Sequence, residues 1–162
     1  MGVAERVNSL PAAAARDGLS GCCGARRWVD AMLAARPFAS DRALFETAEQ
    51  AWWTLSGGDW LEAFAQHPRI GERDKGDARA RSEQAGTAAA AAATRRALAA
   101  GNRTYEARFG HVFLVCATGR SADDMLHELE RRLGNSPAVE LRIAAQEQAK
   151  ITRLRLEKLV ST

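Results

Sequence analysis

The chain has 162 residues, enough for one domain with a sizeable hydrophobic core. Its apolar content of 46% and charged content of 27% are ordinary for a globular protein, and its frequent alanine favours helix over sheet. The net charge of +3 is mild and the arginines are dispersed, so nucleic-acid binding is not indicated.

The cysteines and the apolar runs of the sequence indicate the cellular compartment in which we expect the protein. The three cysteines, of which Cys22 and Cys23 are adjacent, provide neither a disulfide framework nor the spacing of a zinc site. The N-terminal stretch carries Glu5 and Arg6 and lacks the apolar run of a signal peptide. No run of about 18 apolar residues predicts a membrane span. We therefore expect a reduced, cytoplasmic protein.

In the first half of the chain, apolar periodicity and capping residues predict short helices. The predicted helices cover 5–16, 22–35, 41–56 and 59–66. The first is broken at Pro11, and turns at Asp17-Gly18 and Ser20-Gly21 precede the second. Ser40 is the predicted cap of the third helix, and Gly57-Gly58 is its predicted stop.

In the second half, residues 68–80 are rich in charge and glycine and are expected to form a loop. We expect helices over 82–100, 103–109, 122–133 and 137–160, separated by Gly101-Asn102, by an apolar stretch at 111–117 and by a turn at 118–120. The apolar stretch is the only strand candidate and has nothing to pair with, so it is expected to be a buried helix or an extended segment. The chain is thus predicted to be a single all-α domain, 1–162, a bundle of roughly seven or eight helices.

His67 is the most distinctive candidate for chemistry. It closes an apolar helical run and is followed at once by Pro68, which disfavours a helical conformation at His67. An imidazole at a helix end beside a rigid turn is well placed to face a cleft, but spacing alone leaves a structural and a catalytic role equally open. Of the other histidines, His111 is expected to be buried and hydrogen-bonded and His127 solvated. The spacing of the three predicts no metal site.

Two further side chains complete a possible acid–base and anion-binding set. Ser82 is a possible helix cap with Glu83 in the first turn, where most carboxylates serve only the helix dipole. Arg155 shares a predicted face of the last helix with mostly apolar residues, namely Ala144, Gln148, Ile151 and Leu159. An arginine there either extends its charged end to solvent, which spacing favours, or binds an anionic substrate.

Several motifs in order resemble one known family, the 2-oxo-4-hydroxy-4-carboxy-5-ureidoimidazoline (OHCU) decarboxylases of urate degradation. The motifs are Arg36-Pro37-Phe38, His67-Pro68-Arg69-Ile70-Gly71, Ser82-Glu83-Gln84-Ala85-Gly86, Tyr105-Glu106-Ala107-Arg108-Phe109-Gly110, Phe113-Leu114-Val115-Cys116-Ala117, Arg131-Arg132-Leu133 and Lys150-Ile151-Thr152-Arg153-Leu154-Arg155-Leu156. Each motif is weak by itself, but the ordered set covers essentially the whole chain and is highly specific.

The resemblance implies an all-α homodimer without a cofactor that converts OHCU to (S)-allantoin and carbon dioxide. It implies that His67, Glu83 and Arg155 are the catalytic set, with His67 as the proton donor and Arg155 as the anion-binding arginine. The substrate-lining residues that it implies are Pro68, Ala80, Arg81, Ser82, Glu83 and Gln84, together with Phe113, Leu114, Val115, Cys116 and Ala117, of which the last five contribute mainly backbone contacts.

The sequence departs from the animal-type members of this family in two places. It has His111-Val112 where they carry Phe-Pro, and Arg69 where they carry aspartate. Both positions neighbour the expected site without being catalytic groups, so they bear on substrate affinity or pH optimum rather than on the reaction.

The expected chemistry agrees with the residues present. Loss of carbon dioxide leaves an electron pair that the substrate ring can delocalise, so no metal or pyridoxal group is required. Glu83 and Arg155 would orient the substrate while His67, with an imidazole's ordinary pKa of about 6.5, transfers the proton. The alternatives are a non-catalytic helical binding module and a decarboxylase of a related ureido acid.

Overall fold

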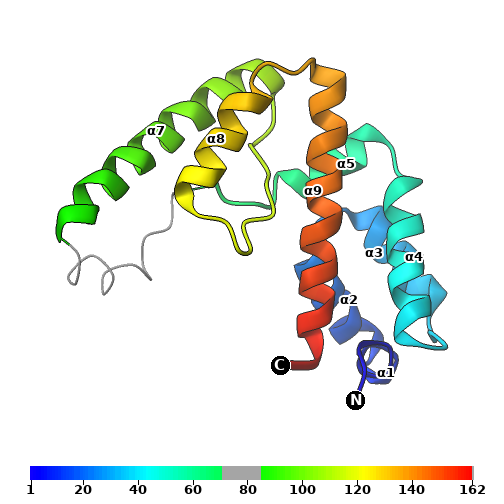
Figure 1. The fold of residues 1–162 in the computed structure, drawn as a ribbon. Helices are drawn as coiled ribbons and strands as arrows, with labels where there is room; N and C mark the ends of the chain where they lie inside the picture. The colour runs from blue at the N-terminus through cyan, green and yellow to red at the C-terminus, as the bar shows by residue number, and fades with distance from the viewer. Residues whose placement is uncertain (71–84, 162) are drawn as a thin grey trace. The chain divides into compact units, whose positions relative to one another are not determined.

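A computed structural model describes residues 1–70 and 85–161, which are helical and contain no β-strand (Figure 1). This confirms the all-α prediction for the described part of the chain. The chain forms two compact units. The first unit consists of Met1–Gln66 and Ala145–Thr162, and the second unit is His67–Ala144.

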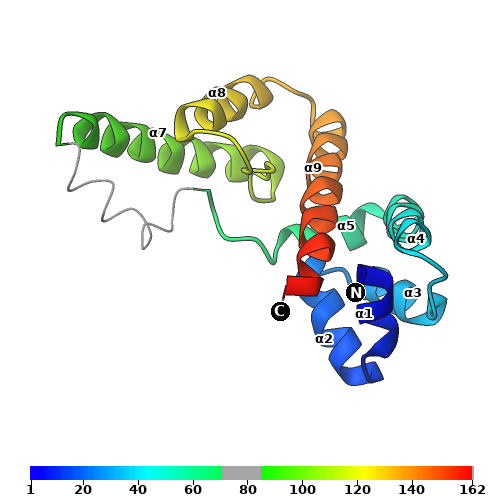
Figure 2. The same ribbon diagram turned by 60° about the horizontal axis from the view of Figure 1, so that its bottom comes forward.

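The first unit is built from short helices and the C-terminal part of a longer one (Figure 2). Its elements are α1 (Val3–Ser9), α2 (Ala12–Cys22), α3 (Arg26–Ala35), α4 (Asp41–Trp53), α5 (Gly57–Phe64), the part of α9 (Pro137–Glu157) from Ala145 onward, and the 3₁₀ turn η1 (Lys158–Ser161).

Tryptophans connect the helices of the first unit. Trp28 of α3 is fully buried and donates its indole N–H to the carbonyl of Ala48 in α4 at 3.1 Å. Trp52 of α4 donates to the carbonyl of Ala145 in α9 at 2.9 Å. A buried indole with a satisfied N–H combines a large apolar area with a directional bond, so these two side chains fix α4 between α3 and α9.

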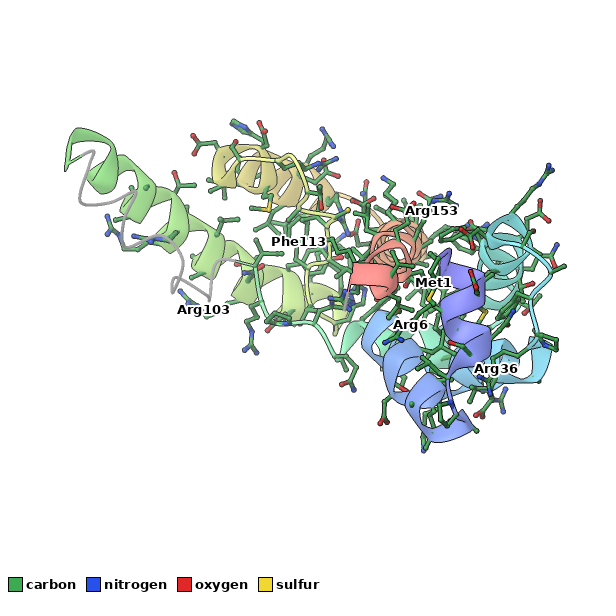
Figure 3. The ribbon with its side chains drawn as sticks, turned by 90° about the horizontal axis from the view of Figure 1, so that it is seen from below. Met1, Arg6, Arg36, Arg103, Phe113 and Arg153 are labelled. Atoms are coloured by element: carbon green, nitrogen blue, oxygen red, sulfur yellow. The ribbon has the colours of Figure 1, made fainter. Side chains whose placement is uncertain are left out.

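The Arg36-Pro37-Phe38 motif lies in the first unit, and Figure 3 labels its Arg36. The Arg36 guanidinium donates to the carbonyls of Val7 and Leu10, at 3.0 and 2.8 Å, where α1 ends. The Asn8 side chain and the Phe38 backbone exchange two hydrogen bonds of 2.9 and 2.8 Å. The motif therefore satisfies the free carbonyls at the end of α1 and ties that helix to the chain after α3.

The second unit consists of α7 (Ala85–Phe109), an extended segment at 112–117, α8 (Ala122–Arg132) and the beginning of α9. Helices α7 and α8 lie side by side (Figure 1). Their core includes Leu98 and Tyr105 from α7, Phe113 and Val115 from the extended segment, and Leu129 from α8. Figure 3 shows Phe113 among these helices.

A buried polar network lies beside this core. Arg132 at the end of α8 pairs with Glu140 of α9, and both side chains are almost completely buried. Glu140 also accepts hydrogen bonds from the Tyr105 hydroxyl at 2.5 Å and from the Asn135 amide at 3.1 Å. Arg132 in turn donates to the carbonyl of Leu114 at 2.7 Å. Buried charges are tolerated only when paired and hydrogen-bonded, and each of these has several partners.

Two of the predicted helix breaks are wrong in the first unit. Helix α2 continues through Asp17-Gly18 and Ser20-Gly21 and ends at Cys22. Its positions Ala15, Leu19 and Cys22 are buried on one face, so tertiary packing outweighs the low helix propensity of glycine. Gly57-Gly58 does not stop a helix either, because Gly57 begins α5 behind a capping box formed by Ser56 and Asp59.

The predicted break at Gly101-Asn102 is also wrong, because α7 runs unbroken to Phe109. A Cβ atom on Gly101 would lie 2.4 Å from Cδ2 of the buried Leu129, so glycine here permits close approach of α7 and α8. Asn102 is 2% exposed, and its side-chain amide donates a hydrogen bond to the Ile70 carbonyl, which lies outside α7.

Other expectations are confirmed. Ser40 caps α4 by accepting from the Ala43 amide, and Ser121 forms a capping box with Asp124 at the start of α8. Residues 112–117 are extended rather than helical. The predicted helix start at 82 and loop at 71–80 lie outside the described residues.

We expect Arg132→Met to lower the free energy of unfolding by about 3–5 kcal/mol, because it leaves the Glu140 carboxylate buried without its cation. Tyr105→Phe removes one hydrogen bond to the same carboxylate and should cost about 2 kcal/mol. Urea unfolding followed by circular dichroism measures both, with the exposed Thr104→Ala on α7 as control. If Arg132→Met lowers the free energy of unfolding no more than Thr104→Ala does, the structural role of the Arg132–Glu140 pair is contradicted.

Candidate functional site

His67 lies in the chain just beyond the end of α5, close to the helix boundary that the Pro68 pattern predicts. The helix ends at Phe64, residues 65–66 form a turn, and His67 lies at a bend with a half-buried side chain. Pro68 is exposed and its ring fixes one backbone dihedral of the turn. A partly accessible imidazole on a stiff turn suits proton exchange with a bound molecule.

Side chains of α7 hold the turn after His67. Asn102 Nδ2 donates to the carbonyl of Ile70 at 2.8 Å, and the Arg69 guanidinium donates to Glu106 Oε1 at 2.8 Å. Ile70 also packs against the core of the second unit. The turn is therefore anchored by a polar contact, an ion pair and an apolar contact.

The segment from Phe113 to Ala117 is the second candidate region. Its first three side chains, Phe113, Leu114 and Val115, are buried, while Cys116 is half-buried and Ala117 exposed. An extended segment forms no hydrogen bonds within itself, so its backbone groups need partners from protein, water or ligand. Arg132 supplies one such partner at the Leu114 carbonyl.

Gly110 lies between the end of α7 and this extended segment. It adopts a positive φ of 79°, which ends α7 and which residues other than glycine rarely adopt. The following His111 is half-buried, lies 3.1 Å through Nδ1 from the Val112 carbonyl, and has its ring 5.5 Å from that of Tyr105. His127 is exposed on α8, as predicted.

Arg155 lies in the part of α9 that belongs to the first unit. It is half-buried and its Nη1 is 3.4 Å from the carbonyl of Gly21. The face of α9 on which it was predicted is buried at Ala144 and Gln148, but it is less apolar than expected, because Gln148 donates a buried hydrogen bond to Thr152 at 2.9 Å.

The guanidinium of Arg155 lies near two buried thiols. Burial raises the pKa of Cys22 to about 12 and that of Cys23 to about 11, and the positive charge of Arg155 opposes both increases. Desolvation is the larger effect, so both cysteines stay protonated at neutral pH. A nucleophilic role for either thiol is therefore not supported.

Five of the predicted substrate-lining residues, Ala80, Arg81, Ser82, Glu83 and Gln84, lie outside the described residues. Of the predicted catalytic set, His67 and Arg155 are described, the first in the second unit and the second in the first unit.

Among 1–70 and 85–161, no group of three or more histidine, cysteine or acidic side chains is arranged to hold a metal ion. Within the same ranges, no helix has both the length and the apolarity needed to cross a membrane.

The partners that hold the candidate regions were not found from the sequence. The sequence predicts a helix stop at Asn102 and shows Glu106 and Arg132 only as members of motifs. A buried polar residue within a helical pattern, such as Asn102, is the signal that points to such a role.

The fold and these regions define a small all-α protein with a half-buried histidine on an anchored turn and a half-buried arginine on its last helix. The family model of OHCU decarboxylase matches residues 8–157, and the chain belongs to this family.

Individual proteins agree with this assignment. The uric acid degradation bifunctional protein of Arabidopsis thaliana is 40% identical over 148 residues, which cover 86% of this chain and 45% of that protein. The 2-oxo-4-hydroxy-4-carboxy-5-ureidoimidazoline decarboxylase of Amia calva is 29% identical over 80% of this chain and 78% of its own length. A crystal structure of OHCU decarboxylase in the presence of (S)-allantoin matches with a TM-score of 0.75 and 42% identity, over 90% of this chain and 99% of that one.

We expect iodoacetamide at about pH 8 to label Cys116 of the native protein before Cys22 or Cys23, because only Cys116 is half-buried rather than buried. Peptide mass spectrometry would locate the label, and labelling in urea should reach all three thiols. Equal native labelling of Cys22 would contradict its burial.

The two buried thiols, Cys22 and Cys23, make stability depend on pH. Above 9.0, the ordinary thiol pKa, they ionise in the unfolded chain but stay protonated in the folded protein, so the unfolded state binds fewer protons. The free energy of unfolding should therefore fall as pH rises from about 9 toward 11, and a Cys22→Ser/Cys23→Ala variant should show a shallower fall.

Proposed function

We propose that this chain is a cofactor-independent decarboxylase that converts OHCU to (S)-allantoin and carbon dioxide. The observation that carries the proposal is its similarity to the solved OHCU decarboxylase, which extends over 90% of this chain and 99% of that chain. The family model runs through both compact units, which supports treating residues 1–162 as one functional domain.

The substrate itself supplies the electron sink. Its carboxylate and hydroxyl share one ring carbon, and the neighbouring ureido-bearing carbon belongs to the ring imine. When the bond to the carboxylate breaks, its electron pair forms a carbon–carbon double bond and the imine nitrogen takes up the displaced electrons. Protonation of the ureido-bearing carbon then gives the stereocentre, and transfer of the hydroxyl proton to the ring nitrogen gives the carbonyl of neutral allantoin. Catalysis thus requires orientation of the carboxylate and a proton donor on one face.

His67 is the proposed proton donor. Its half-buried position gives the imidazole access to a ligand, and the turn that carries it is anchored at Ile70 and Arg69. A donor with a fixed direction protonates one face of the intermediate, which accounts for a single enantiomer. The uncatalysed reaction would give a racemic product.

Arg155 and Glu83 are the proposed orienting groups. The guanidinium of Arg155 is half-buried, which suits binding of a substrate anion through charge-assisted hydrogen bonds. Glu83, with its neighbours Ala80, Arg81, Ser82 and Gln84, and with Pro68, is proposed to contact the ureido and ring groups.

The backbone of Phe113–Ala117 is the remaining proposed contact. Its non-helical conformation supports this role, because its peptide groups are not committed to the hydrogen bonds of a helix and can face a ring with several amide functions. We further propose that the protein is a cytoplasmic homodimer, as the family resemblance implies. Light scattering on the purified protein tests the oligomeric state.

The first test is circular dichroism on freshly generated OHCU, produced from urate by urate oxidase and hydroxyisourate hydrolase. With the protein present, we expect rapid appearance of the optical signal of (S)-allantoin. A rate equal to the slow racemic background would exclude the proposed activity and would favour a related ureido acid or a non-catalytic binding module.

Replacement of His67 and Arg155 should separate their roles. His67→Asn should lower kcat by about 10²–10⁴-fold because the proton donor is lost. Arg155→Lys should raise KM by roughly ten- to a hundredfold, because lysine keeps the charge but not the planar pair of donors.

Matched controls exist for both variants. His127→Asn alters an exposed histidine on α8, and Arg153→Lys alters an exposed arginine on α9 that stacks on the Phe45 ring. Neither control should change turnover. Unchanged kcat in His67→Asn would exclude this imidazole as proton donor.

A further inference from the structure

Two side chains of α7 contact the turn that carries His67. Asn102 and Glu106 are four residues apart and therefore lie on one face of the helix. Asn102 Nδ2 donates to the Ile70 carbonyl and Glu106 accepts from Arg69, each at 2.8 Å. One helix face thus contacts two successive residues of the turn.

Asn102 is unusual in its surroundings. It is 2% exposed in the middle of a 25-residue helix, next in the chain to the closely packed Gly101. Its Oδ1 has no hydrogen-bond partner within the described part of the chain. A buried asparagine lowers helix propensity and leaves one polar atom unsatisfied, so helix stability alone does not account for it. The bond to Ile70 is the interaction that its amide makes.

The backbone between Ile70 and His67 is short and stiff. Pro68 fixes one dihedral angle of the turn, and Ile70 packs against the buried cluster that contains Leu98 and Tyr105. With Ile70 fixed at its carbonyl and its side chain, little freedom remains for the three residues that precede it. The direction of the His67 side chain therefore depends on where Asn102 holds Ile70.

We propose that Asn102 is a positioning residue for His67, and that the Arg69–Glu106 ion pair is a second, weaker clamp on the same turn. This rests on the proposed function, in which His67 donates the proton. Glu106 is partly exposed and Arg69 half exposed, so solvent screens their pair, whereas the Asn102 bond is buried. Displacement of a proton donor by about 1 Å can lower a rate by about a hundredfold.

The main test compares Asn102→Ala with Tyr105→Phe. Both remove a buried side-chain hydrogen bond from α7, but the bond of Tyr105 goes to Glu140 and not to the turn. We expect Asn102→Ala to lower kcat about ten- to a hundredfold with KM within about threefold, and to increase the solvent deuterium isotope effect on kcat. Tyr105→Phe should leave kcat and the isotope effect unchanged.

The isotope effect separates positioning from general loosening of the fold. A misdirected imidazole makes proton transfer slower relative to the other steps, so a step that is sensitive to deuterium limits the rate. Loss of folded protein lowers the amount of active enzyme without changing the isotope effect. Equal losses of kcat in both variants with unchanged isotope effects would overturn the proposal.

The ion pair offers a second test that does not depend on folding of Asn102→Ala. Arg69→Glu places two carboxylates opposite each other and should lower kcat several-fold, and adding Glu106→Arg should restore it. If Arg69 instead contacted substrate directly, the exchanged pair would stay as slow as the single variant. Absence of rescue would therefore overturn the clamp.

Failure of the inference is distinguishable from failure of the proposed function. An inactive His67→Asn together with a fully active Asn102→Ala would overturn the positioning role alone. A fully active His67→Asn would overturn the proton-donor role on which the inference rests.

Discussion

The ion pair between Arg132 and Glu140 is the interaction on which the second unit depends. The chain leaves α7 at Gly110 and continues as an extended segment that has no neighbouring strand in the described part of the chain. Such a segment needs hydrogen-bond donors from elsewhere, and Arg132 provides one at the Leu114 carbonyl. The charge of Arg132 is tolerable in the interior only because Glu140 neutralises it. A single buried cation thus connects the end of α8, the extended segment and the beginning of α9.

The candidate site uses the same principle at the turn that follows His67. The turn after His67 and the extended segment are both irregular, and each is held by a side chain of a helix rather than by a backbone ladder. Asn102 donates a hydrogen bond to the Ile70 carbonyl of the turn, and Arg132 donates one to the Leu114 carbonyl of the extended segment. Irregular backbone gives a site its specific shape, and donors on rigid helices keep that shape fixed. The main contribution of these helices to the candidate site is therefore to hold its irregular segments in place.

The sequence predicts the local features of this fold well and the long-range ones poorly. The Ser40 and Ser121 caps follow from residues three positions away, and the structure confirms both. The sequence predicts helix breaks at Gly18 and Gly101 because nothing local reveals the packing around these two glycines. Gly101 faces Leu129, and Asn102 contacts Ile70, 32 residues earlier in the chain. For the site, ordered motifs lead to the proposed roles of His67 and Arg155, whereas the residues that hold the turn are recognisable only from their contacts.

The distribution of aromatic residues gives the protein an optical reporter in each unit. All four tryptophans, Trp28, Trp52, Trp53 and Trp60, belong to the first unit, and the only tyrosine, Tyr105, belongs to the second. Indole fluorescence therefore reports the packing of the first unit, and phenol absorbance reports the buried surroundings of Tyr105 in the second. Coincident transitions of the two signals would indicate that both units unfold together. Separate transitions would reveal the stability of each unit without any added label.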